Sequence, residues 1–278
     1  MSLLAHPEVR EILRRALAED LGWGDVTTAC TVAPATHARA IIRAKGTCIL
    51  AGAELVRGLA ALVDEVEVGE LVADGTELAP GHVVASLSGP ARSLLAVERV
   101  TLNFLMHLSG VATLTRRYVR AVEGTRARIV DTRKTLPGLR LLQKYAVRVG
   151  GGANHRFGLS DGILIKNNHI AAVGGVGAAV RAARLAAPHT LRVEVECRNL
   201  AEVDEALTAG ADALLLDNMT VEQLRAAVER IGGRALTEAS GGVSLDNVRA
   251  IAECGVDLIS VGALTHSAPA ADLHMTLR

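Results

Sequence analysis

The chain has 278 residues, of which 50% are hydrophobic and 22% charged, with 30 basic and 30 acidic side chains. A chain of this length can bury a full core, and its zero formal net charge gives no bulk field that would recruit nucleic acid or an anionic membrane. Aromatic residues make up only 2%, too few for the stacking platforms of a single-strand binder. We therefore expect neither a nucleic-acid partner nor a membrane partner.

The N-terminus and the cysteines bear on localisation. His6, Pro7, Glu8 and Arg10 interrupt any apolar run that could serve as a signal peptide, and no stretch of about 18 apolar residues occurs elsewhere. The four cysteines are scattered without metal-ligand spacing and are typical of reduced core thiols. These features predict a cytoplasmic protein.

The first part of the chain has the pattern of half-buried strands. Segments 37–52 and 76–89 alternate apolar and polar positions between glycines. Segment 94–122 then has helical spacing, with a predicted break at Ser109 and Gly110. We expect an N-terminal α+β sandwich domain over residues 1–110, on which a tail over 267–278 could pack.

The remainder repeats strand, loop and helix. Six short apolar runs each end on a residue with a reactive side chain or on a glycine that leaves space for a phosphate. They lie at 127–131, 163–166, 191–196, 213–217, 235–242 and 258–262. Strands of a parallel α/β barrel place their carboxyl ends at one mouth, so these endings predict one shared site in an enzyme. Because only six repeats are visible rather than eight, we expect an incomplete, open barrel of about six strands over residues 111–266.

Helix signals support this repeat. Asn199 with Glu202, and Thr220 with Gln223, have the spacing of capping boxes that open two of the helices. The glycine at 210 stands where the first of these helices should stop. The pattern is therefore that of short βα units.

The densest chemistry lies in DTRKTLPGLR, residues 131–140. Arg133 and Lys134 directly follow a predicted strand and could hold an anion at the barrel mouth. The alternative is a solvated loop with incidental charge. The sequence of this segment alone does not decide between the two.

A second group of basic residues occupies one βα unit over 151–169. A glycine run before His155 and Arg156 lets the backbone approach a ligand closely. Lys166 is predicted at a strand terminus, where a buried ammonium would need a partner, more often an anionic ligand than a structural carboxylate. His169 in this loop is either a ligand or a hydrogen-bonded structural residue.

Acidic residues end the next two strands. Glu196 and Asp217 could coordinate magnesium or stabilise positive charge on a sugar ring, and could equally form ion pairs with Arg133, Arg156 or Lys166. The two possibilities are compatible in an empty site. Glu194 shares a strand face with Glu196, so we expect it inside the barrel, paired with a basic residue.

The last two loops resemble phosphate sites. Ser240, Gly241 and Gly242 offer backbone donors and a hydroxyl before a helix expected to begin near Ser244. A second glycine turn follows Ser260, and barrels commonly bind phosphate between their final two loops.

Seven ordered motifs, together with EDLGWGDVTT at 19–28, resemble those of the quinolinate phosphoribosyltransferases, the carboxylating nicotinate-nucleotide pyrophosphorylases. The motifs are ERVTLNFLMHLSGVAT (98–113), DTRKTLPGLR (131–140), NHRFGLSDGILIKNNHI (154–170), VEVEC (193–197), LLLDNM (214–219), EASGGV (238–243) and GVDLISVGALTHS (255–267). The resemblance spans nearly the whole chain. One departure is Asn167, where the family usually has aspartate after the lysine.

The resemblance implies a reaction and its substrates. The family transfers the ribosyl phosphate of phosphoribosyl pyrophosphate (PRPP) to quinolinate, releases pyrophosphate and CO2, and forms nicotinate mononucleotide in de novo NAD biosynthesis. It implies Mg²⁺ and no organic cofactor. It also implies a homodimer in which Arg99 enters the neighbouring subunit's site, with any higher assembly left open.

The resemblance further assigns residues to roles. Catalysis would fall to Glu196, Asp217, Lys134 and Lys166. Quinolinate would be bound by Arg99, Thr132, Arg133, His155, Arg156 and Lys166. The phosphates and the ribose of PRPP would be held by Lys134, Glu196, Asp217, Ser240, Gly241, Gly242, Ser260, Val261 and Gly262. Magnesium would be held by Glu196 and Asp217, directly or indirectly.

Two other functions are compatible with this fold. A molybdenum-transport-associated relative would be a phosphoribosyltransferase for a different substrate, and it is expected to lack the basic dicarboxylate cluster that is complete in this chain. A catalytically idle barrel would bind quinolinate without turnover. Glu196 and Asp217 argue against such a barrel.

Overall fold

The fold was obtained as a computed structural model, which describes residues 2–278 in two compact units. One unit comprises the chain up to Arg116 together with Leu136–Gly151 and Ser267–Arg278. The other comprises Arg117–Thr135 and Gly152–His266. Among the described residues, no helix is both long and apolar enough to cross a membrane.

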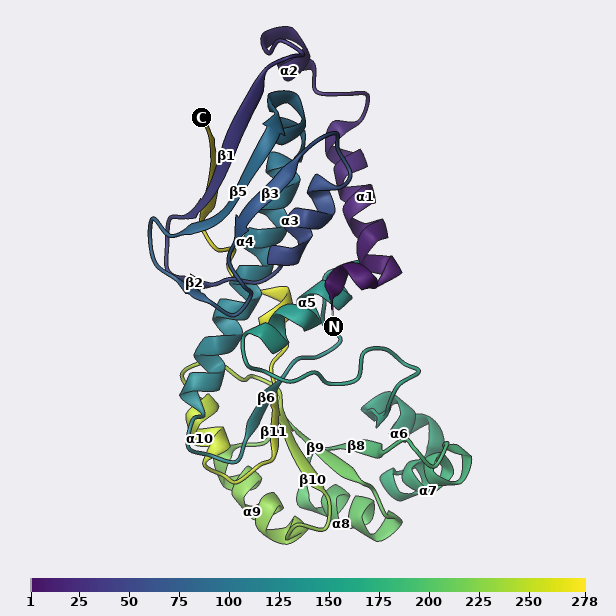
Figure 1. The fold of residues 1–278 in the computed structure, drawn as a ribbon. Coiled ribbons are helices and arrows are strands. Elements are labelled where there is room, and N and C mark those ends of the chain that lie inside the picture. The colour runs from purple at the N-terminus through teal and green to yellow at the C-terminus, as the bar shows by residue number, and fades with distance from the viewer. Residues whose placement is uncertain (1) are drawn as a thin grey trace. The chain divides into compact units, whose positions relative to one another are not determined.

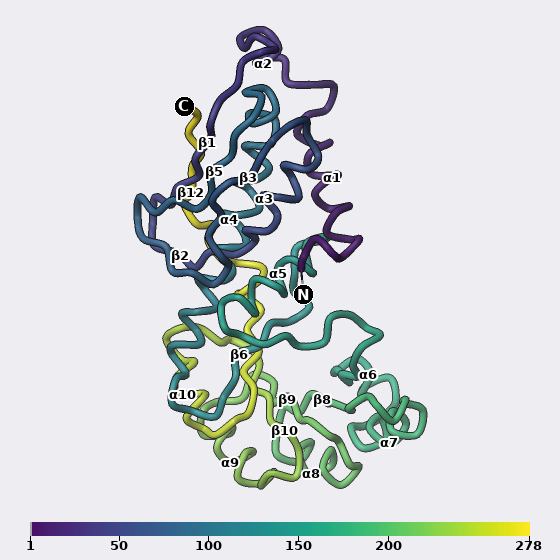
Figure 2. Tube along the Cα trace, in the orientation of Figure 1, coloured from purple at the N-terminus to yellow at the C-terminus, as the bar shows by residue number. Residues whose placement is uncertain are grey.

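The first unit is built on an antiparallel sheet with the strand order β12-β1-β5-β3. These strands are β1 (His37–Ala44), β3 (Glu67–Leu71), β5 (Val83–Pro90) and β12 (Leu273–Leu277). Alternate residues of β1, namely Ala40, Ile42 and Ala44, are buried in the core, as the alternating sequence predicts. The C-terminal strand β12 runs antiparallel beside β1 (Figure 2).

Helices and a short strand pair complete this unit (Figure 1). They are α1 (Pro7–Leu21), α2 (Val26–Thr31), α3 (Ala53–Ala60), α5 (Arg140–Val149), the 3-10 turn η1 (Leu3–Ala5), and the pair β2 (Cys48–Ile49) and β4 (Glu77–Leu78). Helix α1 begins where the His6 side chain accepts a hydrogen bond from the Glu8 backbone N–H, with Pro7 at its first position. It buries Val9, Leu13 and Leu17, which are spaced four residues apart on one helix face.

The predicted helix break at Ser109 and Gly110 is wrong. Helix α4 runs without interruption over Ala91–Ala121. A Cβ at Gly110 would lie 2.1 Å from the carbonyl oxygen of Pro269, and the Ser109 hydroxyl accepts the Ala51 N–H at 3.1 Å. Both residues therefore allow distant segments of the chain to pack closely against the helix. Their low helix propensity alone does not indicate this role.

The second unit is an open barrel of six parallel strands in the order β6-β11-β10-β9-β8-β7. The strands are β6 (Arg128–Val130), β7 (Ile163–Ile165), β8 (Val193–Cys197), β9 (Ala213–Asp217), β10 (Leu236–Ser240) and β11 (Leu258–Ser260). Strands β6 and β7 stand at the two ends of this order, so the sheet is not closed. The predicted incomplete six-stranded barrel is confirmed.

Each barrel strand leads into a loop and then a helix. The helices of this unit are α6 (Asn167–Val173), α7 (Val176–Ala186), α8 (Leu200–Ala209), α9 (Val221–Ile231), α10 (Val248–Ala252) and α11 (Ala263–His266). The capping box of Thr220 and Gln223 is confirmed at the start of α9. Asn199 caps α8 as predicted, but the Glu202 carboxylate accepts the backbone N–H of Arg198 rather than that of Asn199, so that box is incomplete.

Candidate active site

The carboxyl ends of the six parallel strands surround a pocket of about 430 Å³. The lining residues come from all six strand ends and the loops that follow them. They are Thr132, Arg133, Lys134, His155, Arg156, Leu164, Lys166, Glu196, Leu215, Asp217, Asn218, Glu238, Ser240, Gly241, Gly242 and Ser260. Parallel topology thus assembles one site from segments more than a hundred residues apart in the sequence.

Most of the predicted site residues therefore lie together, but three do not line this pocket. Arg99 lies exposed on α4. Val261 is 1% exposed, and its backbone N–H donates to the Val130 carbonyl at 3.0 Å. Gly262 stands against the stem of Lys134, since a Cβ at Gly262 would lie 3.0 Å from Lys134 Cδ.

The loop after β6 is fixed by hydrogen bonds at both of its ends. Asp131 is fully buried and accepts hydrogen bonds from Asn154 Nδ2 at 2.5 Å and from the His155 N–H at 2.9 Å. Thr132 Oγ1 accepts the Lys134 N–H at 3.0 Å, and the Lys134 carbonyl accepts the Thr265 hydroxyl at 2.7 Å. These bonds hold the backbone of the two predicted anion-binding residues between neighbouring strands.

Lys166 and Glu196 form an ion pair in the pocket. Lys166 Nζ lies 2.6 Å from Glu196 Oε1, and the Asn167 N–H donates to Glu196 Oε2 at 3.1 Å. The predicted burial of Lys166 is wrong, because half of its side chain is exposed at the end of β7, and its partner is a carboxylate. The ion-pair alternative for Glu196 is therefore realised, with Lys166 as the partner.

His169 has a structural role at the start of α6. Its Nδ1 accepts the backbone N–H of Lys166 at 2.9 Å. The histidine thus caps the turn that presents Lys166, in agreement with the hydrogen-bonded alternative.

One imidazole and two carboxylates form a cluster at the pocket, of which His155 and Glu238 line it. His155 Nε2 is 3.1 Å from Glu194 Oε2 and 3.6 Å from Glu238 Oε2. Glu194 has the inward orientation and the basic-residue partner that its strand position predicts. Burial, and then the Glu194 charge, raise the pKa of Glu238 against the opposing effect of His155, to about 7.

Arg156 presents an unsatisfied donor. Its Nη1 donates to the Gly162 carbonyl at 2.9 Å, while its Nε is buried without a hydrogen-bond partner among residues 2–278. Burial, and then the charge of Arg133, lower the pKa of the Arg156 guanidinium. A buried unpaired donor beside a second cation is stabilised when an anion binds.

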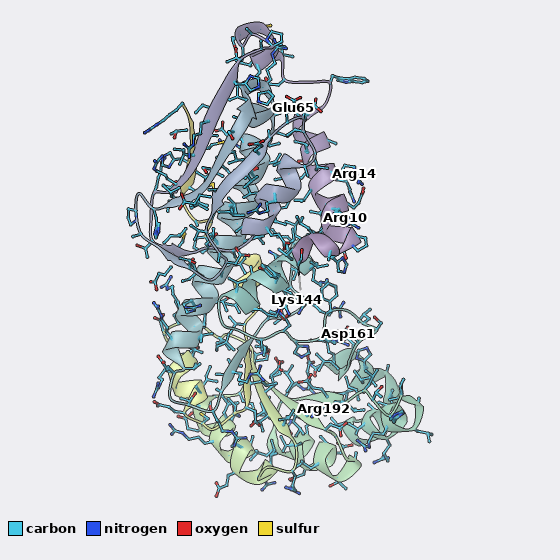
Figure 3. The ribbon with its side chains drawn as sticks, in the orientation of Figure 1. Arg10, Arg14, Glu65, Lys144, Asp161 and Arg192 are labelled. Carbon is cyan, nitrogen blue, oxygen red and sulfur yellow. The ribbon has the colours of Figure 1, made fainter. Side chains whose placement is uncertain are left out.

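The loop between Arg156 and Gly162 is closed by Asp161, labelled in Figure 3. Its carboxylate accepts the Phe157 N–H at 2.5 Å and the Gly158 N–H at 2.7 Å. The carbonyl that holds the Arg156 guanidinium therefore belongs to an ordered turn.

The glycine loop after β10 needs glycine for two reasons, a close approach at Gly241 and a left-handed backbone at both Gly241 and Gly242. Gly241 has a φ of 94°, and a Cβ there would lie 2.2 Å from Asn218 Oδ1. Gly242 also has a positive φ, of 61°. The helix predicted near Ser244 begins later, at Val248, because the Asn247 side chain accepts the Ser244 N–H and closes a turn first.

Two polar residues of the pocket were not predicted as site residues. Asn218 follows β9 with a φ of 55°, a conformation that asparagine tolerates better than most residues. Glu238 is 1% exposed and is the central residue of β10. A polar residue interrupting a buried strand is the signal that could have identified it.

Comparison with known proteins identifies the family. The family described as "Quinolinate phosphoribosyl transferase, N-terminal domain" matches residues 25–109, and the family described as "Quinolinate phosphoribosyl transferase, C-terminal domain" matches residues 111–276. Together they cover most of the chain.

Individual relatives agree. The chain is 48% identical to the nicotinate-nucleotide pyrophosphorylase [carboxylating] of Mycobacterium leprae, over 96% of each chain. It is 44% identical to a probable enzyme of the same name from Bacillus subtilis, over 97% of this chain and 93% of that protein. The structure of NadC from Streptococcus pyogenes matches with a TM-score of 0.93 at 43% identity, over 98% of this chain and 96% of that one. The chain therefore belongs to the quinolinate phosphoribosyltransferase family.

Proposed function

We propose that the barrel pocket holds quinolinate and PRPP side by side and assign its residues accordingly. The chain is a decarboxylating phosphoribosyltransferase of NAD biosynthesis: it joins quinolinate to the ribose of PRPP and gives nicotinate mononucleotide, pyrophosphate and CO2. The observation that carries the assignment is that three basic residues, Arg133, Arg156 and Lys166 (the cationic wall), line one pocket together with two acids, Glu196 and Asp217. The basic residues suit a dianionic acceptor, and the acidic residues suit a donor that develops positive charge.

Quinolinate would lie against the cationic wall. Arg156 and Arg133 would each hold a carboxylate, since the buried Nε of Arg156 has no partner of its own. The Lys166 ammonium, which forms an ion pair with Glu196, would also contact quinolinate. Thr132 would complete the quinolinate-binding wall. His155, which the sequence also predicts as a quinolinate-binding residue, lines the same pocket.

The two acids would act on the ribose. As the bond to pyrophosphate breaks, the ribose ring develops oxocarbenium character. The carboxylates of Glu196 and Asp217 stabilise that charge and can accept the ribose hydroxyls. Because the charge exists chiefly in the transition state, these acids contribute more to rate than to binding.

Magnesium fits this acidic side of the pocket. Both Glu196 oxygens already accept hydrogen bonds, from Lys166 and Asn167, whereas the Asp217 carboxylate faces the pocket. Asp217 would therefore hold Mg²⁺, and Glu196 would act on it indirectly. The ion supplies charge neutralisation for the departing pyrophosphate.

The phosphates would lie toward the glycine loops. Ser240, Gly241 and Gly242 offer backbone and hydroxyl donors for the 5′-phosphate, and Ser260 lies in the same wall. Val261 and Gly262 would support this wall from behind. Lys134, whose backbone is held by Thr265, would reach the pyrophosphate.

Decarboxylation needs no organic cofactor. Glycosylation makes the pyridine nitrogen quaternary, so the electron pair left at C2 by departing CO2 is stabilised by the ring's own positive charge until a proton from water takes the place of CO2. The residues of this chain need only bind and orient the dicarboxylate.

We further propose a cytoplasmic homodimer in which Arg99 completes the quinolinate subsite of the partner. Residues 1–110 would form the domain that contributes Arg99, and residues 111–266 the catalytic barrel. No nucleic-acid or membrane partner is expected, and the zero formal net charge supports this.

A stoichiometry assay tests the function. Purified protein with carboxyl-labelled quinolinate, PRPP and Mg²⁺ should form nicotinate mononucleotide and release one CO2 and one pyrophosphate per product. Omitting magnesium should lower the rate sharply. Tight quinolinate binding without any product would instead support the idle barrel, and would refute the proposed function.

A further inference from the structure

The hydrogen bonds that His155 makes with Arg156 and Glu194 fix the state of its imidazole, while the buried Glu238 carboxyl lies 3.6 Å from the same ring nitrogen without a hydrogen bond to it. The backbone N–H of Arg156 donates to His155 Nδ1 at 2.6 Å. A backbone N–H can only donate, so Nδ1 carries no proton. Nε2 then carries the proton of the neutral ring and donates it toward Glu194, at 3.1 Å. The ring therefore has no further N–H to give to a ligand.

The same pattern argues against a metal ion in the cluster. His155, Glu194 and Glu238 offer three ligand atoms within 4.8 Å of one another, close enough to hold one. A metal would need the lone pair of Nε2, which would leave the ring without either proton, since Nδ1 is already an acceptor. Burial and the neighbouring Glu194 also raise the pKa of the Glu238 carboxyl to about 7, so it holds a proton more readily than an ordinary carboxyl, whereas a metal ligand must lose it.

The imidazole connects this cluster to Arg156. Asp131 holds the backbone of His155 from β6, and the ring of His155 holds the backbone N–H of Arg156. The Arg156 side chain then packs over Gly162, where a Cβ would lie 3.2 Å from Arg156 Cβ. Its Nε remains buried and unpartnered among the described residues. The contacts thus run from the Glu238 carboxyl, which packs 3.6 Å from His155 Nε2, through the His155 ring to Arg156.

We propose that Glu238 is a positioning residue of the quinolinate subsite: with Glu194 it fixes the ring of His155, and this ring fixes Arg156, which contacts the substrate carboxylate. The proposal rests on the proposed function and changes one part of it. His155, predicted from sequence as a direct ligand, acts through Arg156 instead. Glu238 also lines the pocket, but in this relay it acts on quinolinate through His155 and Arg156 rather than by direct contact.

Quinolinate affinity tests the relay. Glu238→Ala should weaken quinolinate binding by about tenfold, because weakening one hydrogen bond to a charged group costs on this order. PRPP affinity should stay unchanged, and Glu238→Gln, which keeps a neutral polar group, should restore most of the loss. In the Arg156→Ala or His155→Ala background, Glu238→Ala should cause no further loss, since residues acting through one another are not additive.

Thr237→Val is the matched control. Thr237 is the adjacent residue of β10, buried on the opposite face, where its hydroxyl bonds Asp257 at 2.8 Å. This variant should lower stability without changing quinolinate affinity. An equal loss of affinity in Thr237→Val, or losses that add in the double variants, would overturn the proposal.

The histidine tautomer gives a second test that needs no acidic variant. Nitrogen NMR of ¹⁵N-histidine-labelled protein, with His155→Gln used for assignment, should show a neutral ring protonated at Nε2 both before and after quinolinate binds. An imidazolium or an Nδ1–H ring in the complex would overturn the proposal. Activity of the unaltered protein with quinolinate is measured first, so failure of the function and failure of the relay are distinguished.

Discussion

Replacing Asp217 by asparagine should lower kcat by roughly 10²–10³-fold and change quinolinate affinity little, since a single preorganised electrostatic group is worth about this much. Asp217 ends β9 and faces the pocket, where it would stabilise charge that exists only as the ribose bond breaks. Glu196→Gln should lower kcat in the same way. Steady-state kinetics give kcat, and calorimetry without PRPP gives the quinolinate Kd.

Asp204→Asn is the control for this change of charge. Asp204 lies exposed on α8, where it pairs with Arg230, and such surface pairs contribute little. Its kcat should match that of the unaltered protein. If Asp217→Asn weakened quinolinate binding and left kcat intact, the acids would belong to the acceptor site rather than to the ribose.

Mixing two inactive variants should restore activity if the site is shared between subunits. Arg99 is exposed on α4 and belongs to a different compact unit from the pocket. Arg99→Ala and Lys166→Ala homodimers should each be nearly inactive. In their heterodimer one site carries both lesions and the other carries neither, so activity should recover toward about half of that of the unaltered dimer.

The control mixture pairs Lys166→Ala with Arg156→Ala. Both residues line the pocket of the same chain, so every site of that heterodimer carries one lesion and no recovery is expected. Subunit exchange is confirmed by mass. Exchange without recovery in the Arg99 mixture would place Arg99 in its own subunit's site or outside the chemistry.

The sequence predicts the open barrel because its signal is repeated and local. Glu196 and Asp217 end strands of similar spacing, and their position at one mouth follows from parallel topology alone. The inward orientation of Glu194 follows equally from the period of two in a strand. These predictions needed no knowledge of distant contacts.

Other features depend on segments that meet only in the folded chain. The break expected at Gly110 fails because Pro269, far along the sequence, packs there. The burial expected of Lys166 fails because the end of β7 opens into the pocket, where Glu196 meets it. Glu238 was not predicted as a site residue because the role of a buried acid depends on its neighbours in the fold, here Glu194 and His155. The local sequence pattern contains no information about these contacts between distant segments.

The most direct measurement of the central claim compares two acceptors. The cationic wall is proposed to hold two carboxylates, and nicotinate has only one. With PRPP and Mg²⁺, kcat/KM for quinolinate should exceed that for nicotinate by at least about 10³-fold, because a charged group left unpaired in a desolvated site is costly. Comparable turnover of nicotinate would contradict the assignment of this pocket to a pyridine dicarboxylate.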